Sequence, residues 1–79
     1  MGFEVQVVVL LPKSPNAHAM DVLADHFASA VHDPGSKVVT LIEHVSVPDE
    51  ADAVAFVRGL VFEVAPEGSK ITEITATSD

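Results

Sequence analysis

The chain has no cysteine, no tryptophan and no tyrosine among its 79 residues. Without cysteine it can form neither a disulfide nor a thiolate metal site. A chain of this length buries only about 60–65% of its unfolded surface, and such a core rarely supplies more than about 3–5 kcal/mol. We therefore expect one domain over residues 1–79, with a frayed tail at 77–79. Because the core of this domain is marginal, self-association is favoured.

Basic residues are scarce as well, with four Lys and Arg against twelve Asp and Glu and a formal charge of −8. A protein that binds the phosphate backbone of a nucleic acid needs a basic stripe, which this chain lacks. The same acidity repels anionic membranes. Nucleic-acid and membrane partners are thus not expected, whereas protein partners, cationic ligands and metals remain open.

Long apolar runs are also missing, since none approaches the roughly 20 residues of a membrane span. The first residues lack the basic start of a secretory signal. A hydrophobic fraction of 48% excludes general disorder. We expect a soluble cytoplasmic protein, and the abundance of Ala, Val and Asp is typical of bacterial or phage coding sequences.

A repeated tripeptide is the most informative feature that is present. Gly-Ser-Lys occurs at 35–37 and at 68–70, an offset of 70 − 37 = 33 residues, and the same offset pairs Pro15 with Pro48. The apolar positions of the two preceding segments align in the same way: Met20, Leu23, Ala24, Phe27, Ala28 and Val31 with Ala53, Phe56, Val57, Leu60, Val61 and Val64. This pattern predicts one strand–helix unit that occurs twice and is followed by a last strand.

The expected elements are strands over 3–11, 37–47 and 71–77, with helices over 15–32 and from 48 to about 65. A rival interpretation makes 60–65 a strand in a hairpin with 69–75. The alignment of the two apolar stripes favours the helix, because a hairpin would not require it.

This order of elements predicts an α/β fold, a small βαβαβ domain with a three-stranded, mostly parallel sheet and two helices. Strand order 2-1-3 places one helix on each face of the sheet. Order 1-2-3 places both helices on one face and leaves Val8 and Leu10 uncovered on the other. Both orders leave open strand edges and favour a homodimer. Because Phe62 lies off the main apolar stripe of its helix, we expect the oligomer interface to include Val8, Leu10 and Phe62.

Ligands of open parallel sheets bind beyond the carboxyl ends of the strands. Polar side chains follow the first two predicted strands there. They form the candidate ligand-binding set: Lys13, Ser14, Asn16, His18, Glu43 and His44. Since no glycine-rich loop follows the first strand, neither the dinucleotide nor the P-loop pattern is met.

Other polar groups do not form a catalytic or metal-binding set. His18, Asp21, Asp25 and His32 share one face of the first predicted helix, but the His-x-x-x-His spacing is absent, so this is interpreted as a solvated face without a metal. Ser29 lies three residues from two histidines, without an oxyanion hole in view. Both Gly-Ser-Lys segments lie at the amino ends of strands and are interpreted as turns. We expect no catalytic residue, no cofactor and no enzymatic activity.

The sequence therefore favours a small, acidic, self-associating protein-interaction or regulatory module. The alternative is a small-molecule or metal-binding domain that uses the candidate set at the strand ends. An acidic mimic of nucleic acid ranks last, because only Asp49, Glu50 and Asp52 cluster, where they suit the start of a helix.

Overall fold

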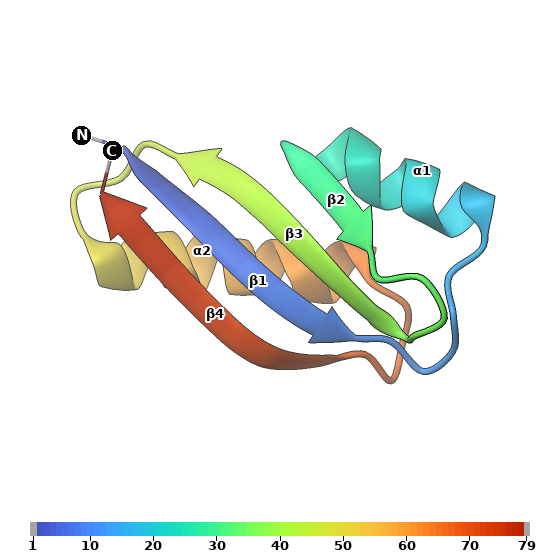
Figure 1. The fold of residues 1–79 in the computed structure, drawn as a ribbon. Helices are drawn as coiled ribbons and strands as arrows, with labels where there is room; N and C mark the ends of the chain where they lie inside the picture. The colour runs from blue at the N-terminus through green and yellow to red at the C-terminus, as the bar shows by residue number, and fades with distance from the viewer. Residues whose placement is uncertain (1, 79) are drawn as a thin grey trace.

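The structure, a computed structural model, describes residues 2–78 and shows four strands and two helices within them (Figure 1). The elements are, in chain order, β1 (Phe3–Leu10), α1 (Ala17–His26), β2 (Ser29–His32), β3 (Val38–Val45), α2 (Glu50–Val64) and β4 (Lys70–Ser78). The strands form a single sheet in the order β2-β3-β1-β4. Every neighbouring pair in this sheet is antiparallel.

The predicted three-stranded, mostly parallel sheet is wrong, and the cause is strand β2. Its residues were expected to form the last turns of the first helix. Helix α1 ends at His26, however, and Phe27 already has extended backbone angles (φ −124°, ψ 155°). Since each element reverses the direction of the chain, one additional strand makes β3 antiparallel to β1 instead of parallel. What remains of the prediction is a small domain that mixes helices with a sheet.

The repeated tripeptide marks a repeated turn. In Asp33–Ser36 and in Pro66–Ser69 the amide of the fourth residue donates to the carbonyl of the first, at 3.1 and 3.2 Å. The third residue is Gly35 or Gly68, with φ of 78° and 92°. A glycine with positive φ at this position is typical of a type II turn. The first turn joins β2 to β3 and the second joins α2 to β4, so the two turns serve different connections.

The second predicted helix is confirmed, which excludes the hairpin interpretation of residues 60–65. Asp49 caps α2, because its Oδ1 accepts a hydrogen bond from the amide of Asp52 at 2.8 Å. Ala53, Val57 and Val61 recur every four residues and are the buried side chains of the helix. Helix α1 begins at Ala17, two residues later than predicted, and is capped by Asn16.

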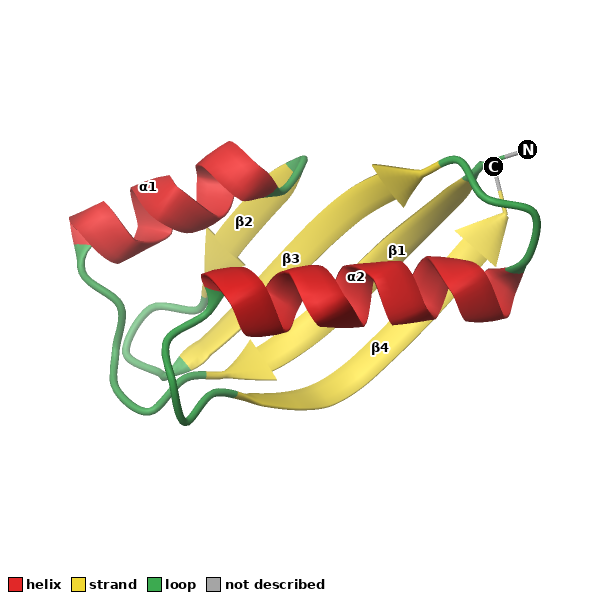
Figure 2. Ribbon diagram, turned by 180° about the vertical axis from the view of Figure 1, so that it is seen from behind, coloured by secondary structure: helices red, strands yellow, loops and turns green. Residues whose placement is uncertain are grey.

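The order of strands and helices is that of two split β-α-β units, as in ferredoxin-like folds. In the first unit, α1 connects β1 to β2, and β3 lies between these two strands in the sheet. In the second unit, α2 connects β3 to β4, and β1 lies between them. Both helices cover the same face of the sheet, as Figure 2 shows. Of the two strand orders that the sequence left open, the three predicted strands follow 2-1-3, with the first strand between the other two, but both helices lie on one face (Figure 2), as expected only for the order 1-2-3.

The hydrophobic core lies between this helix-covered face and the two helices. Strand β1 alternates strictly, since Phe3, Val5, Val7 and Val9 are buried and the residues between them are at least partly exposed. The core comprises these and side chains from the other elements and from residues next to them: Phe3, Val5, Val7, Val9, Leu11, Leu23, Phe27, Val39, Leu41, Val45, Ala53, Val57 and Val61.

Strand β4 is the outer strand beside β1. Its register shifts once, at Thr72, whose hydroxyl donates to the carbonyl of Val8 at 3.2 Å. Thr77 and Ser78, which we expected to fray, pair with Glu4 and Phe3. Asp79, the last residue of the expected tail, lies outside the described residues.

Candidate functional site: the uncovered face of the sheet

The six candidate ligand-binding residues lie in two groups at opposite ends of the sheet. Lys13, Ser14 and Asn16 follow β1, and His18 lies in the first turn of α1. Glu43 and His44 end β3, where His44 pairs with Glu4 at the start of β1. Because β3 is antiparallel to β1, the two groups are separated by the eight residues of β1, or roughly 24 Å at about 3.4 Å per residue. They do not form one site.

Three residues of the first group, but not His18, line a cavity of about 190 Å³ between the β1–α1 connection, α1 and the end of α2. Apolar side chains make up most of its wall, and Lys13, Ser14 and Asn16 supply the polar part. The Ser14 hydroxyl donates to the carbonyl of Ser36 at 3.2 Å, and the Asn16 Oδ1 accepts from the amide of Ala19 at 2.8 Å. Two of the three polar side chains are thus engaged within the protein.

The second group is divided between the two faces of the sheet. Glu43 pairs with the core residue Val5 and so points to the helix side, whereas His44 points to the other side, with its Nε2 at 4.0 Å from Oε1 of Glu4. Within residues 2–78, no three His, Cys, Asp or Glu side chains are grouped so that they could hold a metal ion. No helix of this part of the chain is long and apolar enough to cross a membrane.

Side chains from all four strands lie together on the sheet face that carries no helix (Figure 2). We call it the open face. The strand registers place the following side chains on it: Glu4, Gln6, Val8 and Leu10 from β1; Val38, Thr40, Ile42 and His44 from β3; Ser29 and Val31 from β2; and Lys70, Glu73, Thr75 and Thr77 from β4.

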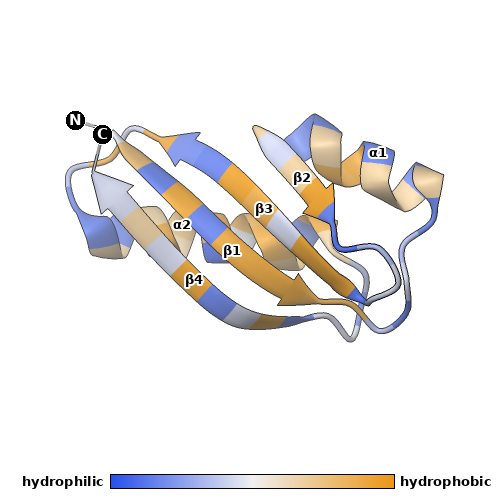
Figure 3. Ribbon diagram, in the orientation of Figure 1, coloured by the Kyte–Doolittle hydropathy of each residue, from blue (hydrophilic) through white to orange (hydrophobic). Residues whose placement is uncertain are grey.

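One half of the open face is apolar. Val8, Leu10, Val31, Val38 and Ile42 surround Thr40, and we call these six residues the apolar patch. Leu10 is 38% exposed and Val31 is 59% exposed, and the other four are half-buried. Figure 3 shows the hydrophobic stretch where the end of β1 lies beside β3. No member of the patch is charged, so a partner could cover it without desolvating an ion.

Polar and charged side chains border this patch. Glu4, Gln6 and His44 occupy the opposite half of the open face. On β4, Lys70 pairs with Leu10 and Glu73 pairs with Val8, so that one base and one acid lie along the same border. The open face therefore combines an uncharged half with charges of both signs along its border.

Of the three predicted interface residues, Val8 and Leu10 lie in the apolar patch. Phe62 does not join them, because α2 packs on the other face of the sheet, where this side chain is 63% exposed. Sequence reasoning missed Val31, which it placed in a helix. The signal that could have identified it is the Pro-Gly turn at 34–35, which is followed closely by the β-branched residues 38–40 and so fits a hairpin.

Comparisons with models of protein families, with curated protein sequences and with solved structures found no match to this chain.

Proposed function

We propose that this protein is a non-catalytic, self-associating interaction module whose open face packs against the open face of a second copy. The observation that carries the proposal is the apolar patch on a sheet face that neither helix covers. Two sheets can pack face to face about 10 Å apart with their side chains interdigitated. The patch supplies the side chains for such a contact.

Association would add apolar burial to a domain with a small core. Burying apolar surface contributes about 25 cal/mol per Å², and the patch contains three aliphatic side chains that are only half-buried and two that are more exposed. A partner that binds only the folded state also stabilises that state by mass action. Association would thus stabilise a domain that has no disulfide to support it.

The flanking charges favour a second copy as the occupant. A two-fold axis through the patch brings the same surface together from both subunits. Because Lys70 and Glu73 both border the patch on β4, each subunit presents one acid and one base to its partner. Like charges elsewhere on two chains of charge −8 oppose the contact at long range.

The small-molecule alternative has less support. The cavity beside Lys13 has about 190 Å³, below the roughly 300–1,000 Å³ that is usual for ligand sites. Two of its polar side chains already have protein partners, and Glu43 and His44 lie at the other end of the sheet.

Molar mass as a function of concentration tests the proposal. We expect light scattering or sedimentation equilibrium to show a rise from the monomer mass of 8.3 kDa toward twice that value as the concentration is raised. Salt should strengthen the association, because it screens the repulsion between two acidic subunits over a Debye length of about 10 Å at 0.1 M. A constant mass of 8.3 kDa at millimolar concentration, with and without salt, would contradict the proposal.

A further inference from the structure

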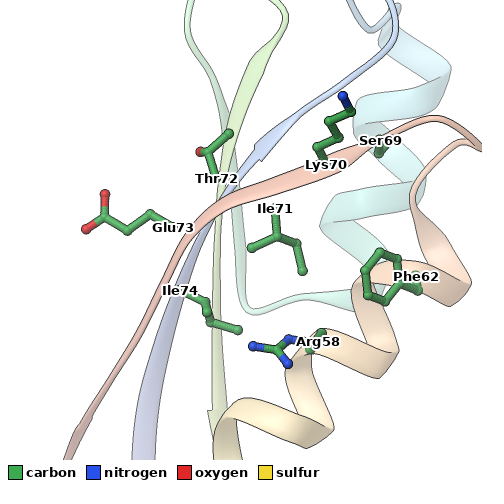
Figure 4. A pocket seen from close by; sticks show the side chains of 8 residues that line it. All are labelled: Arg58, Phe62, Ser69, Lys70, Ile71, Thr72, Glu73 and Ile74. Atoms are coloured by element: carbon green, nitrogen blue, oxygen red, sulfur yellow. The ribbon is translucent and has the colours of Figure 1, made fainter.

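A second surface lies at the edge of the sheet, between β4 and α2. We call it the β4 groove. It has a volume of about 670 Å³. Figure 4 shows the side chains of Ile71 and Ile74 from β4 beside those of Arg58 and Phe62 from α2. Lys70 and Glu73 of the open face also line the groove at its border, but the two isoleucines pair with the core residues Val9 and Val7 and so lie on the helix side.

The outer edge of β4 is free to accept another strand. In the sheet order β2-β3-β1-β4, β4 pairs only with β1, so alternate residues of β4 direct their backbone N–H and C=O groups away from the sheet. Proteins usually block such edges with bulges, Lys or Pro. Here the irregularity at Thr72 and the charge of Lys70 lie in the part of β4 that lines the groove, so an added strand is expected to pair with the residues that follow them. From Glu73 to Ser78 the register is regular and no proline occurs.

The wall that α2 contributes is apolar, with one cation. Phe62 is 63% exposed, and Arg58 is exposed one turn before it. The ion pair found within residues 2–78 joins His44 to Glu4, so Arg58 has no carboxylate partner there. The residues three and four positions from Arg58 on α2 are Val54, Ala55, Val61 and Phe62, none of which can pair with it.

From this arrangement we propose that the β4 groove binds an extended segment of another polypeptide, which adds to β4 as a fifth strand. The segment is mostly uncharged, with apolar side chains at alternate positions over Phe62, Ile71 and Ile74. It carries one carboxylate that reaches Arg58. Backbone hydrogen bonds to the strand edge supply affinity, and the alternate side chains supply specificity. A guanidinium favours a carboxylate because the two can form paired hydrogen bonds.

The charges identify this occupant. A strongly acidic segment would be repelled by the chain's net charge of −8, so a single carboxylate placed at Arg58 fits better than a run of them. A second copy of β4 fits less well. Its helix-side residues are Ile71, Ile74 and Ala76, and its one carboxylate, on Glu73, lies on the open face. Self-pairing would thus leave Arg58 without a partner.

Selection from displayed peptides tests the proposal, and its outcome does not depend on association of the open faces. A library of random peptides of about eight residues would be selected on the immobilised wild-type protein. We expect enrichment of sequences with alternate aliphatic residues and one Asp or Glu at a fixed position. No enrichment, or enriched peptides without a carboxylate, would overturn the proposal.

The best enriched peptide would then be titrated against two charge-reversal variants. We expect Arg58→Glu to weaken its binding about tenfold or more, because a like charge replaces the cation. The matched control is Lys37→Glu, which makes the same charge change at an exposed residue outside the groove. Equal losses in both variants would overturn the assignment to this groove.

Amide hydrogen exchange provides the structural readout. Peptide binding should slow exchange in β4, between Glu73 and Ser78, and leave β2 at the opposite edge unchanged. Association of the open faces would slow exchange in β1 and β3 as well as in β4. Slowing that depends on protein concentration without any peptide, and that is confined to β4, would therefore show that a second copy occupies the edge, and would overturn the proposal.

Discussion

Replacing Leu41 by alanine is expected to leave the domain largely unfolded at 25 °C. Leu41 is 1% exposed and lies in β3, among the largest fully buried side chains. Truncation of a buried leucine costs about 2–5 kcal/mol, because the transfer energy is lost and a cavity remains. That cost is comparable with the about 3–5 kcal/mol that a core of this size supplies. Urea titration followed by circular dichroism measures the change.

Phe56→Ala is the matched control for Leu41→Ala. Phe56 is the larger side chain, but it is 57% exposed on α2. We expect its truncation to cost less than about 1 kcal/mol. Both variants should be measured at low protein concentration, so that association contributes little to the apparent stability. If Leu41→Ala lost no more stability than Phe56→Ala, the core would not lie between the sheet and the helices.

Val8→Lys is expected to weaken self-association about 100-fold or more, which corresponds to about 2.7 kcal/mol. Val8 belongs to the apolar patch and pairs with Thr40 on β3 and with Glu73 on β4. Packing of two open faces would bury an ammonium group near its symmetry mate, which is costly without a paired partner. In the monomer the new lysine can lie beside Glu73, so we expect the fold to persist. Sedimentation equilibrium measures the change in the association constant.

Ala55→Lys is the control for this charge change. Both substitutions alter the net charge from −8 to −7, but Ala55 is exposed on α2, away from the open face. Lower net charge alone should slightly favour association, so the expected loss for Val8→Lys cannot arise from added repulsion. Equal association of both variants and the wild type would show that the open face is not the interface.

Much of the fold could be predicted from local patterns. The alternation of Phe3, Val5 and Val7 identifies β1, and the segment after Pro48 is a helix because its apolar residues recur every four positions. The third predicted strand corresponds to β4. In each case local preference and tertiary packing agree, so a single sequence carries the information.

Strand β2 could not be predicted in the same way. Its four residues are too few to show a period of their own, and Val31 continues the helical spacing of Leu23 and Phe27. The exposed edge of β3 decides the outcome, since β2 pairs with residues 39–42 there. Such a pairing is a tertiary interaction that overrides weak local propensity. The repeated turn added to the error by suggesting two equal units.

The candidate site was predictable to a similar extent. Val8 and Leu10 follow from alternation within one strand, which needs no knowledge of topology. The grouping of Lys13 with His44 depended on parallel strands, and it fails because β3 runs the other way. The β4 groove combines residues of α2 with residues of the next strand, so it requires knowledge of their packing.

The most direct test of the proposed interface is an isotope-filtered NOE experiment on a mixture of labelled and unlabelled protein, at a concentration where dimers are populated. It detects only contacts between different copies of the chain. Packing of two open faces predicts intermolecular NOEs among the methyl groups of Val8, Leu10 and Ile42. Intermolecular NOEs confined to Phe62, Ile71 and Ile74, or none at all in a sample shown to be dimeric, would contradict it.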